Sequence, residues 1–316
     1  MNNEKSINVA IVGAGYMARE HIRAFKDITN VTVSGITSRT RSRAEALASE
    51  FQIGGIFDSI PEMYEKAPAD LVVVAVPELA TNANCRACFE FPWYALVEKP
   101  VGFNLADAED IESQARAAKA RVFVALNRRN YSSTITALHD LTTIEGRRFI
   151  HVQDQEDQNR ALQAGQPKNV VDNWMFANSI HIIDYLVIFG RGNVVKVNKI
   201  IPWDPKHPWL VLAQIEYDSG DIGYYEAVWN SPGPWSASIL TTDKRWELRP
   251  LEKASYQTAG QRTLETVVIH EWDQLFKPGL RRQADLAIQE VRGQKTSLPT
   301  LQEALRTMNL IQEIYS

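Results

Sequence analysis

The sequence predicts an α/β protein with two domains, the first built on a doubly wound parallel sheet and the second on a mostly antiparallel open sheet. A chain of 316 residues exceeds the usual size of one compact core. Strand and helix signals alternate over residues 1–126, as in parallel βαβ units, whereas long strand candidates dominate residues 127–316. We therefore place the domain boundary between residues 126 and 127.

Apolar and β-branched runs predict the strands of the first domain, and helical patterns lie between them. The run at 71–76 is apolar at every position, which is typical of a strand buried on both faces. The expected strands are 7–12, 31–37, 71–76, 95–97 and 122–126. The expected helices are 17–27, 41–51 and 107–120.

The second domain contains longer strand candidates, two of which are joined by turn residues at 218–221. The expected strands are 147–155, 194–201, 210–217, 222–229 and 236–242. The expected helices are 131–141, 178–189, about 271–292 and about 300–315. The last helix carries Leu301, Leu305, Met308 and Ile311 on one stripe, so we expect it to pack back on the body of the protein.

Composition and charge exclude several classes of function. The net charge of −4 and the charged fraction of 23% give no general attraction for nucleic acid or for an anionic membrane. Residues 1–6 are polar and lack a secretory pattern, and no apolar run approaches the length of a membrane span, so a soluble cytoplasmic protein is expected. Cys85 and Cys88 form a C-x-x-C pair without a second ligand pair, which favours two packed residues over a metal or redox site.

A glycine-rich loop follows the first strand and precedes the first helix. Gly13 permits a tight turn, Gly15 lets the backbone approach a pyrophosphate, and the small Ala18 allows close packing of helix on strand. The helix begins near Tyr16 and Met17, where unpaired N–H groups favour phosphate. The loop therefore predicts a dinucleotide-binding Rossmann domain.

The end of the second strand favours NADP over NAD. An acidic residue there would bind the ribose hydroxyls of NAD, but the chain offers Ser38, Arg39 and Arg43, which suit a 2′-phosphate. A solvated helix start is the alternative for these arginines, and NAD is the alternative cofactor. We also expect Val76 and Pro77, at the end of the strand 71–76, to contact the cofactor.

A second motif, Glu98-Lys99-Pro100, ends an apolar strand, and His181 is followed by Asp184 with the spacing H-x-x-D. Through these residues, the glycine loop and Pro77, the chain resembles the glucose-fructose oxidoreductase, inositol dehydrogenase and MocA family over nearly its full length. The resemblance implies a Rossmann domain and a carboxy-terminal domain whose open sheet forms homodimers or homotetramers. It implies activity on sugars, nucleotide sugars, cyclitols or related compounds.

The resemblance implies that Lys99 contacts the reacting oxygen, and it places Glu98 and Lys99 beside the cofactor. Hydride transfer at a carbinol carbon requires a group that exchanges the hydroxyl proton and polarises the carbonyl, and an ammonium group does both. His181 would be a second acid/base group or substrate ligand. The alternative is a histidine of the hydrophobic core whose ring makes its hydrogen bonds within the protein. Asp184 would orient that ring or cap a neighbouring group.

The chain departs from the family at two positions beside the histidine. Ala177 stands where relatives often have an aspartate, and Ser179 where they often have glycine. Either Asp172 or Asn173 on the preceding loop reaches the site, or the lysine and histidine suffice, as in a ketone or imine reduction. Thr81, where relatives often have histidine, also makes standard inositol or glucose oxidation less expected.

Three residues at the domain boundary are candidate substrate contacts: Asn127, Arg128 and Tyr131. Arg128 would hold a carboxylate or a nucleotide-sugar phosphate, or else form an interdomain salt bridge. The tryptophans of the second domain either stack on a sugar ring or pack in the core. They are Trp174, Trp229 and Trp235.

The leading prediction is an NAD(P)-dependent dehydrogenase or reductase of a sugar-like substrate, with NADP favoured and with Lys99 and His181 as acid/base groups. One alternative is an NAD-dependent lyase or glycosidase-type enzyme, in which an oxidised intermediate drives elimination and the cofactor is regenerated. The other is a non-catalytic cofactor-binding regulatory protein, a reading that Ala177 favours.

Overall fold

Six parallel strands form the sheet of the first compact unit, in the order β3-β2-β1-β4-β5-β6. The structure is a computed structural model that describes residues 5–316, so residues 1–4 of the polar terminus considered above lie outside the described residues. The order reverses between β1 and β4, where Rossmann folds bind dinucleotides. The strands are β1 (Ile7–Val12), β2 (Val31–Thr37), β3 (Ile56–Phe57), β4 (Leu71–Val74), β5 (Tyr94–Glu98) and β6 (Arg121–Ala125).

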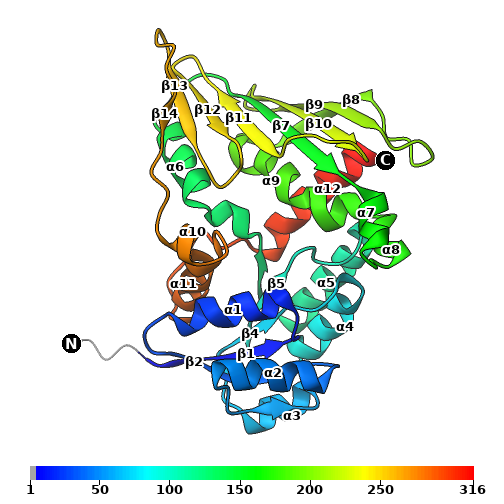
Figure 1. The fold of residues 1–316 in the computed structure, drawn as a ribbon, viewed down its shortest axis with the longest axis vertical. Helices are drawn as coiled ribbons and strands as arrows, with labels where there is room; N and C mark the ends of the chain where they lie inside the picture. Colours follow the sequence, from blue (N-terminus) through cyan, green and yellow to red (C-terminus); the bar gives the residue numbers. More distant parts are fainter. Residues whose placement is uncertain (1–4) are drawn as a thin grey trace. The chain divides into compact units, whose positions relative to one another are not determined.

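Six helices accompany this sheet (Figure 1). Asn104 precedes helix α5, and its side chain accepts a hydrogen bond from the backbone amide of Asp107. The asparagine thereby caps one of the free N–H groups in the first turn of the helix. The helices are α1 (Tyr16–Lys26), α2 (Arg41–Phe51), α3 (Ile60–Lys66), α4 (Glu78–Phe89), α5 (Leu105–Ala118) and α11 (Leu280–Val291). The predicted doubly wound sheet is confirmed.

A late segment of the chain, residues 274–305, belongs to the first unit, although the predicted boundary placed it in the second domain. Helix α11 packs on α1, and its apolar stripe of Leu280, Ala284 and Ala287 is buried in the core of this unit. These positions recur at helical spacing, so one face of α11 closes the core. The predicted helix 271–292 was wrong as one element: α10 (Trp272–Leu275) ends before Pro278, and Gly279, at φ +76°, precedes α11.

The second unit, residues 128–273 and 306–316, contains an eight-stranded sheet in the order β14-β13-β12-β11-β7-β10-β9-β8. All pairs are antiparallel except β7 with β10, so the predicted mostly antiparallel sheet is confirmed. The strands are β7 (Phe149–Glu156), β8 (Val194–Ile201), β9 (Leu210–Tyr217), β10 (Ile222–Trp229), β11 (Ser236–Leu240), β12 (Lys244–Leu248), β13 (Ser255–Thr258) and β14 (Glu265–Thr266).

Helices cover one face of this sheet: α9 packs on β7 and β11, and α6 packs on β12 (Figure 1). Along β9 and β10, buried and half-buried residues alternate, so the opposite face keeps half-exposed side chains. The helical elements are the 3-10 turn η1 (Asn127–Asn130), α6 (Ser132–Leu141), α7 (Gln158–Gln163), α8 (Lys168–Val171), the π-helical turn η2 (Met175–Ser179), α9 (Ile180–Phe189) and α12 (Leu301–Tyr315). Helix α12 begins in the first unit and ends in the second.

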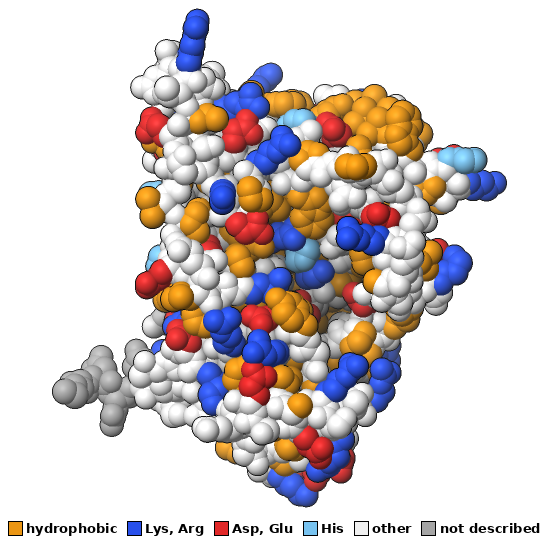
Figure 2. All heavy atoms as spheres, viewed as in Figure 1, with side chains coloured by type: hydrophobic (Ala, Val, Ile, Leu, Met, Phe, Trp, Pro, Cys, Tyr) orange, Lys and Arg blue, Asp and Glu red, His pale blue; other side chains and the backbone are white. Residues whose placement is uncertain are grey.

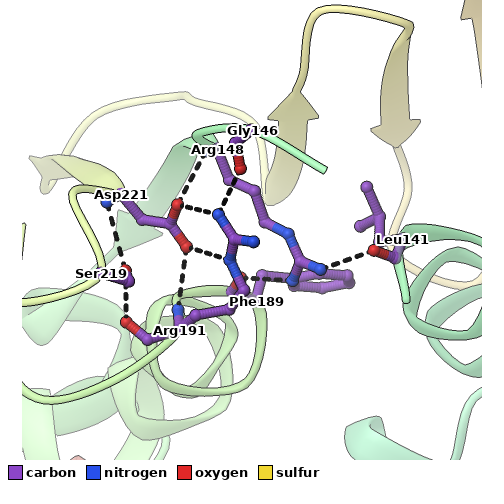
Figure 3. A network of polar contacts seen from close by, with 7 residues as sticks. All are labelled: Leu141, Gly146, Arg148, Phe189, Arg191, Ser219 and Asp221. Atoms are coloured by element: carbon purple, nitrogen blue, oxygen red, sulfur yellow. Dashed lines mark hydrogen bonds and ion pairs between the residues drawn. The ribbon is translucent and has the colours of Figure 1, made fainter. Parts of the chain in front are cut away.

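A buried carboxylate and the arginines beside it join the ends of four elements of the second unit (Figure 3). Asp221, at the start of β10, accepts hydrogen bonds from the backbone amides of Arg148 and Arg191 at 2.8 and 3.0 Å and from the Arg191 guanidinium at 2.6 and 2.9 Å. The Arg148 guanidinium donates to the carbonyl oxygens of Phe189 and Leu141. This network connects β7, β10 and the carboxyl ends of α6 and α9.

Within residues 5–316, no helix has both the length and the apolar character that a membrane span requires.

Candidate active site

The two loop glycines meet different surroundings. Gly13 has φ +113°, and a Cβ added there would lie 2.1 Å from the Ala75 carbonyl oxygen, so any side chain would collide with backbone. A Cβ at Gly15 would meet nothing within 4 Å. Gly15 also precedes α1, whose first turn has no side-chain cap and no acidic residue. The loop therefore leaves an open helix N-terminus, which fits the pyrophosphate of a dinucleotide.

The other loop residues divide between core and surface. Ala18 is fully buried, and Met17 packs partly buried against the same core. The Tyr16 side chain is 64% exposed, with the Lys277 ammonium 5.6 Å from its ring centroid. Tyr16 is thus positioned at the surface beside the open helix terminus.

At the end of β2, the three arginines are not equivalent. The guanidinium of Arg41 pairs with Glu45 and Asp58, and these hydrogen bonds raise its pKa. Arg39 and Arg43 are exposed, and their guanidinium groups make no hydrogen bond or ion pair with the described residues. Two of the three arginines are therefore available to an anionic ligand.

The carboxyl end of β4 lies against the glycine loop. The Ala75 amide donates to the Val12 carbonyl at 2.8 Å, and Val76 Cγ1 would lie 3.4 Å from a Cβ on Gly13. Pro77 is exposed and immediately precedes α4. The structure thus brings Val76 to the loop and leaves Pro77 at the adjoining surface.

A buried hydrogen bond joins α1 to the carboxyl end of β5. The His21 ring is fully buried and its Nε2 lies 2.7 Å from Glu98 Oε1; because a carboxylate only accepts, the imidazole is the donor. The second oxygen of Glu98 accepts from the Lys99 backbone amide at 3.2 Å. Glu98 therefore connects the helix behind the glycine loop to the residue that bears the candidate catalytic ammonium.

In the second unit, His181 occupies the first turn of α9, directly after the π-helical turn η2. It is half-buried, and its ring lies edge-on to Trp235 at 6.4 Å between centroids. A π-helical turn adds a residue to the helix and re-aims the side chains around it, and such turns are frequent at functional sites. Ala177 lies within this turn and is buried.

Two buried carboxyl groups lie beneath η2. Glu156, the last residue of β7, accepts hydrogen bonds from Trp174 Nε1 at 2.6 Å and from Asn178 Nδ2 at 2.9 and 3.1 Å. Asp154, two residues earlier on the same inward face, accepts from the Tyr225 hydroxyl at 2.6 Å. Burial, followed by the charge of Asp154, raises the pKa of Glu156 well above its usual range. Burial also raises the pKa of Asp154, so the pair retains a proton that exposed acids release.

The two loop residues considered as replacements for the family aspartate both have partners within their own loop. The Asp172 carboxylate is bound by Lys168 at 2.7 Å and is mostly exposed. The Asn173 side chain donates to the Asn169 carbonyl. The acid that the structure places against η2 is instead Glu156, which the sequence analysis missed. Its signal was an acidic residue at an inward-facing position of a strand.

Arg128 stacks on the indole of Trp235, with its guanidinium carbon 4.1 Å from the ring centroid. It also lies beside Tyr131, a buried phenol whose pKa is raised by desolvation and partly restored by the charge of Arg128. Asn127 is buried in the first unit, where its amide donates to the Pro278 carbonyl at 2.9 Å. Of the three predicted boundary residues, Arg128 and Tyr131 therefore lie together in the second unit, and Asn127 belongs to the first.

Asp184 is engaged within the second unit. Both of its oxygens accept from the Arg129 guanidinium at 2.7 Å, and Oδ1 also accepts from the Thr307 hydroxyl. This bidentate pair is buried, so Asp184 fixes α9 to the segment before α6 and to α12.

The cysteine pair is buried in α4. Desolvation raises the pKa of Cys88 to about 12 and that of Cys85 well above its ordinary value, which disfavours the reactive thiolate. Across residues 5–316, no cluster of three or more His, Cys, Asp or Glu side chains is arranged to hold a metal ion.

Comparisons with known proteins agree with this architecture. The model of an oxidoreductase family with an NAD-binding Rossmann fold matches residues 7–126. The 4-carboxy-2-hydroxymuconate-6-semialdehyde dehydrogenase of a Sphingobium species is 23% identical over 237 residues, which cover 72% of this chain and 74% of that enzyme.

Solved structures share the fold over nearly the whole chain. A dehydrogenase from Chromobacterium violaceum superposes with a TM-score of 0.83 at 19% identity, covering 98% of this chain and 94% of that one. Levoglucosan dehydrogenase, solved with NADH and levoglucosan, gives a TM-score of 0.81 at 16% identity, covering 98% and 96%. Residues 7–126 therefore match the oxidoreductase family that includes glucose-fructose oxidoreductase, inositol dehydrogenase and MocA, and the fold of the whole chain is that of the solved dehydrogenases.

Proposed function

We propose that the chain transfers a hydride between a nicotinamide cofactor and a hydroxyl-bearing or carbonyl carbon of a sugar, nucleotide sugar or related polyol. Lys99 and His181 act as its acid/base groups. The observation that carries the proposal is the position of Glu98: it is bonded to His21 of α1 and to the amide of Lys99. One buried carboxylate thereby ties the helix behind the glycine loop to the segment that bears the reacting ammonium.

The residues of the first unit fit a dinucleotide. Gly15 leaves space for a pyrophosphate at the uncapped start of α1, and Tyr16, Met17 and Ala18 provide the first-turn amides. Val76, Pro77 and Glu98 border the rest of the cofactor site at the carboxyl ends of β4 and β5. When bound, the nicotinamide donates or accepts the hydride.

The unpaired guanidinium groups of Arg39 and Arg43, together with the Ser38 hydroxyl, favour NADPH. A 2′-phosphate carries charge that a guanidinium binds in a bidentate manner. Arg41 is excluded from this role because it is already held by Glu45 and Asp58.

Lys99 exchanges the proton of the reacting hydroxyl and polarises the carbonyl as charge develops on oxygen. His181 supplies a second proton-exchanging group, whose pKa range suits transfer near neutral pH. Asp172 and Asn173 remain candidate outer contacts of the substrate, as does Asn127. The family aspartate is replaced by Ala177, so the reaction proceeds with the lysine and the histidine alone.

The names of the relatives support this substrate class. Levoglucosan dehydrogenase acts on an anhydrosugar, and the Sphingobium enzyme acts on a semialdehyde. Both names denote dehydrogenases, and the reaction proposed here is likewise a hydride transfer to or from the nicotinamide, with Lys99 exchanging the proton.

The test is a comparison of wild type with Lys99→Met and with a matched surface change, Lys196→Met. Hydride transfer is followed at the NADPH absorbance band with a panel of aldoses, keto sugars and nucleotide sugars. We expect Lys99→Met to bind NADPH almost as wild type does and to lose about 10²–10⁴-fold in turnover. Lys196→Met should match wild type, since Lys196 is exposed on β8. Normal turnover by Lys99→Met would remove this lysine from the mechanism.

A further inference from the structure

Arg128 is a half-buried cation of the second unit without an acidic partner. Its Nη1 is buried and makes no hydrogen bond with any described residue. The other enclosed arginines of this unit have partners for their terminal nitrogens: Arg129 has Asp184, Arg191 has Asp221, and Arg148 has two carbonyl oxygens, although its Nε has none. Because a buried donor without an acceptor is costly, the unpaired terminal nitrogen of Arg128 requires an explanation, and binding of an anionic ligand is one.

The Arg128 guanidinium lies over an aromatic ring that is itself held by a hydrogen bond. Its carbon lies 4.1 Å from the centroid of the Trp235 ring, and the indole is held in turn by Nε1, which donates to the Gln155 carbonyl at 2.9 Å. Stacking occupies one face of the guanidinium and leaves its N–H edges for hydrogen bonding. The arrangement presents a preorganised fork of donors.

The same indole also contacts the proposed acid/base group. The His181 ring meets Trp235 edge-on at 6.4 Å, so Arg128 and His181 lie against one aromatic ring. An anion held by Arg128 would therefore belong to a molecule that also reaches His181.

We propose that Arg128 binds a carboxylate of the substrate, so that the enzyme acts on hydroxy, keto or aldehyde acids of the sugar type and selects them over neutral sugars. This inference rests on the proposed function, because it assigns the substrate class of the same site. A planar carboxylate matches the guanidinium fork with two parallel hydrogen bonds, whereas a neutral hydroxyl leaves the buried charge unpaired. The Sphingobium relative is named for a carboxylated semialdehyde, which fits this class.

The first experiment compares acid and neutral partners on NADPH-loaded wild-type protein by calorimetric titration. The pairs are D-glucuronate with D-glucose, D-galacturonate with D-galactose, and L-tartrate with erythritol. In at least one pair we expect the acid to bind about tenfold or more tightly, since the hydrogen bonds are charge-assisted. D-Glucose 6-phosphate separates a carboxylate from a phosphate site. Binding of the phosphate ester alone, or no acid preference in any pair, would overturn the proposal.

The second experiment places the preference on Arg128. Arg128→Leu should abolish the difference between acid and neutral partners and leave NADPH affinity within about twofold, while Arg128→Lys should retain part of the difference. Trp235→Phe keeps an aromatic face and should weaken the preference less than Trp235→Leu. An acid preference that survives Arg128→Leu would refute the assignment.

Hydride transfer measured on the same preparations distinguishes the two proposals. Transfer to neutral sugars without any acid preference would reject the carboxylate site and leave the oxidoreductase function standing. Arg128-dependent binding of carboxylates without hydride transfer to any compound would do the reverse. A thermal denaturation curve for each variant excludes loss of fold as the cause.

Discussion

The buried imidazole of His21 lies 2.7 Å from the carboxylate of Glu98, and this pair links α1 to the end of β5. The glycine loop precedes α1 and Lys99 follows β5, so the pair joins the cofactor-binding element to the proposed catalytic lysine. One hydrogen bond therefore fixes the position of α1 relative to the segment that bears Lys99.

Replacing His21 with leucine should destabilise the protein by about 1–3 kcal/mol, because the buried oxygen of Glu98 loses its donor. Ile22→Val, at the fully buried neighbouring position, is the control: it measures how much a small change in the core alone lowers the free energy of unfolding. Urea denaturation of His21→Leu, Glu98→Gln and the double variant gives the coupling free energy. Strict additivity of the two single effects would show that the pair does not interact.

The fold was largely predictable because its strands carry local signals. The apolar run at 71–76 and the β-branched run at 7–12 were found at β4 and β1 within two residues at each end. Elements with a weak local signal were missed: β3 has only two residues, and α4, although it has 12, lacks a clear apolar stripe. Such elements are stabilised by contacts with a neighbouring strand or sheet. A local sequence pattern does not contain this information.

The candidate site was predictable only where it follows strand ends. The loop at Gly13 and the lysine after β5 were located because parallel strands place their carboxyl ends at one edge. The contact of Arg128 with Trp235 and the burial of Glu156 beneath η2 join segments distant in sequence. Their partners are set by the register of β7 and β11, which the sequence alone did not provide.

The two glycines of the loop should respond differently to alanine. Gly13→Ala places a Cβ against the Ala75 carbonyl at positive φ, so it should lower the thermal midpoint or prevent folding. Gly15→Ala meets open space and should leave the midpoint nearly unchanged, yet reduce NADPH affinity by about tenfold or more where the pyrophosphate approaches. Thermal denaturation and cofactor titration on both variants separate these effects. Unchanged NADPH affinity in Gly15→Ala would contradict pyrophosphate binding at this loop.

Alanine at Arg39 or Arg43 should raise the KM for NADPH by about tenfold and leave the KM for NADH almost unchanged, because only NADPH has the 2′-phosphate. Arg41→Ala is the matched control, since this side chain is held by Glu45 and Asp58. Initial rates with both cofactors provide the measurement. Equal losses with NADH and NADPH would show that these arginines do not read the 2′-phosphate.

The buried acids predict a fall in stability as pH rises. The pKa of Glu156 is raised by burial and by Asp154, so the folded state binds a proton more tightly than the unfolded state does. The free energy of unfolding therefore decreases as the pH rises from the unfolded-state pKa, about 4.3, to the raised folded-state pKa. Glu156→Gln mimics the protonated form and should make this decrease shallower.

Urea denaturation at a series of pH values, rising from about 5, above the unfolded-state pKa, measures the slope. Asp204→Asn is the control, because the pKa of this exposed acid is lowered and it is ionised in both states over the same range. An equally steep fall in wild type and Glu156→Gln would show that Glu156 is ionised in the folded protein.

The sheet face opposite α9 predicts self-association, as the resemblance implied. Half-exposed apolar residues lie on it, including Leu210, Val228 and Tyr224, and Figure 2 shows hydrophobic side chains gathered over the β8–β10 end of the sheet. Such a face is stabilised when a second copy covers it. We therefore expect the wild-type protein to form a dimer or tetramer, and Tyr224→Asp, which places a charge on this face, should give a smaller species.

Light scattering after size exclusion, at several micromolar concentrations, gives the mass of each variant. Glu109→Lys on α5 is the control for a surface charge change, and it should keep the wild-type mass because Glu109 is exposed in the first unit. His151 contacts the Tyr224 ring at 5.4 Å on this face, so His151→Asp should act in the same direction as Tyr224→Asp. A monomeric wild type would refute the predicted self-association, and an assembly that both changes leave intact would place the interface elsewhere.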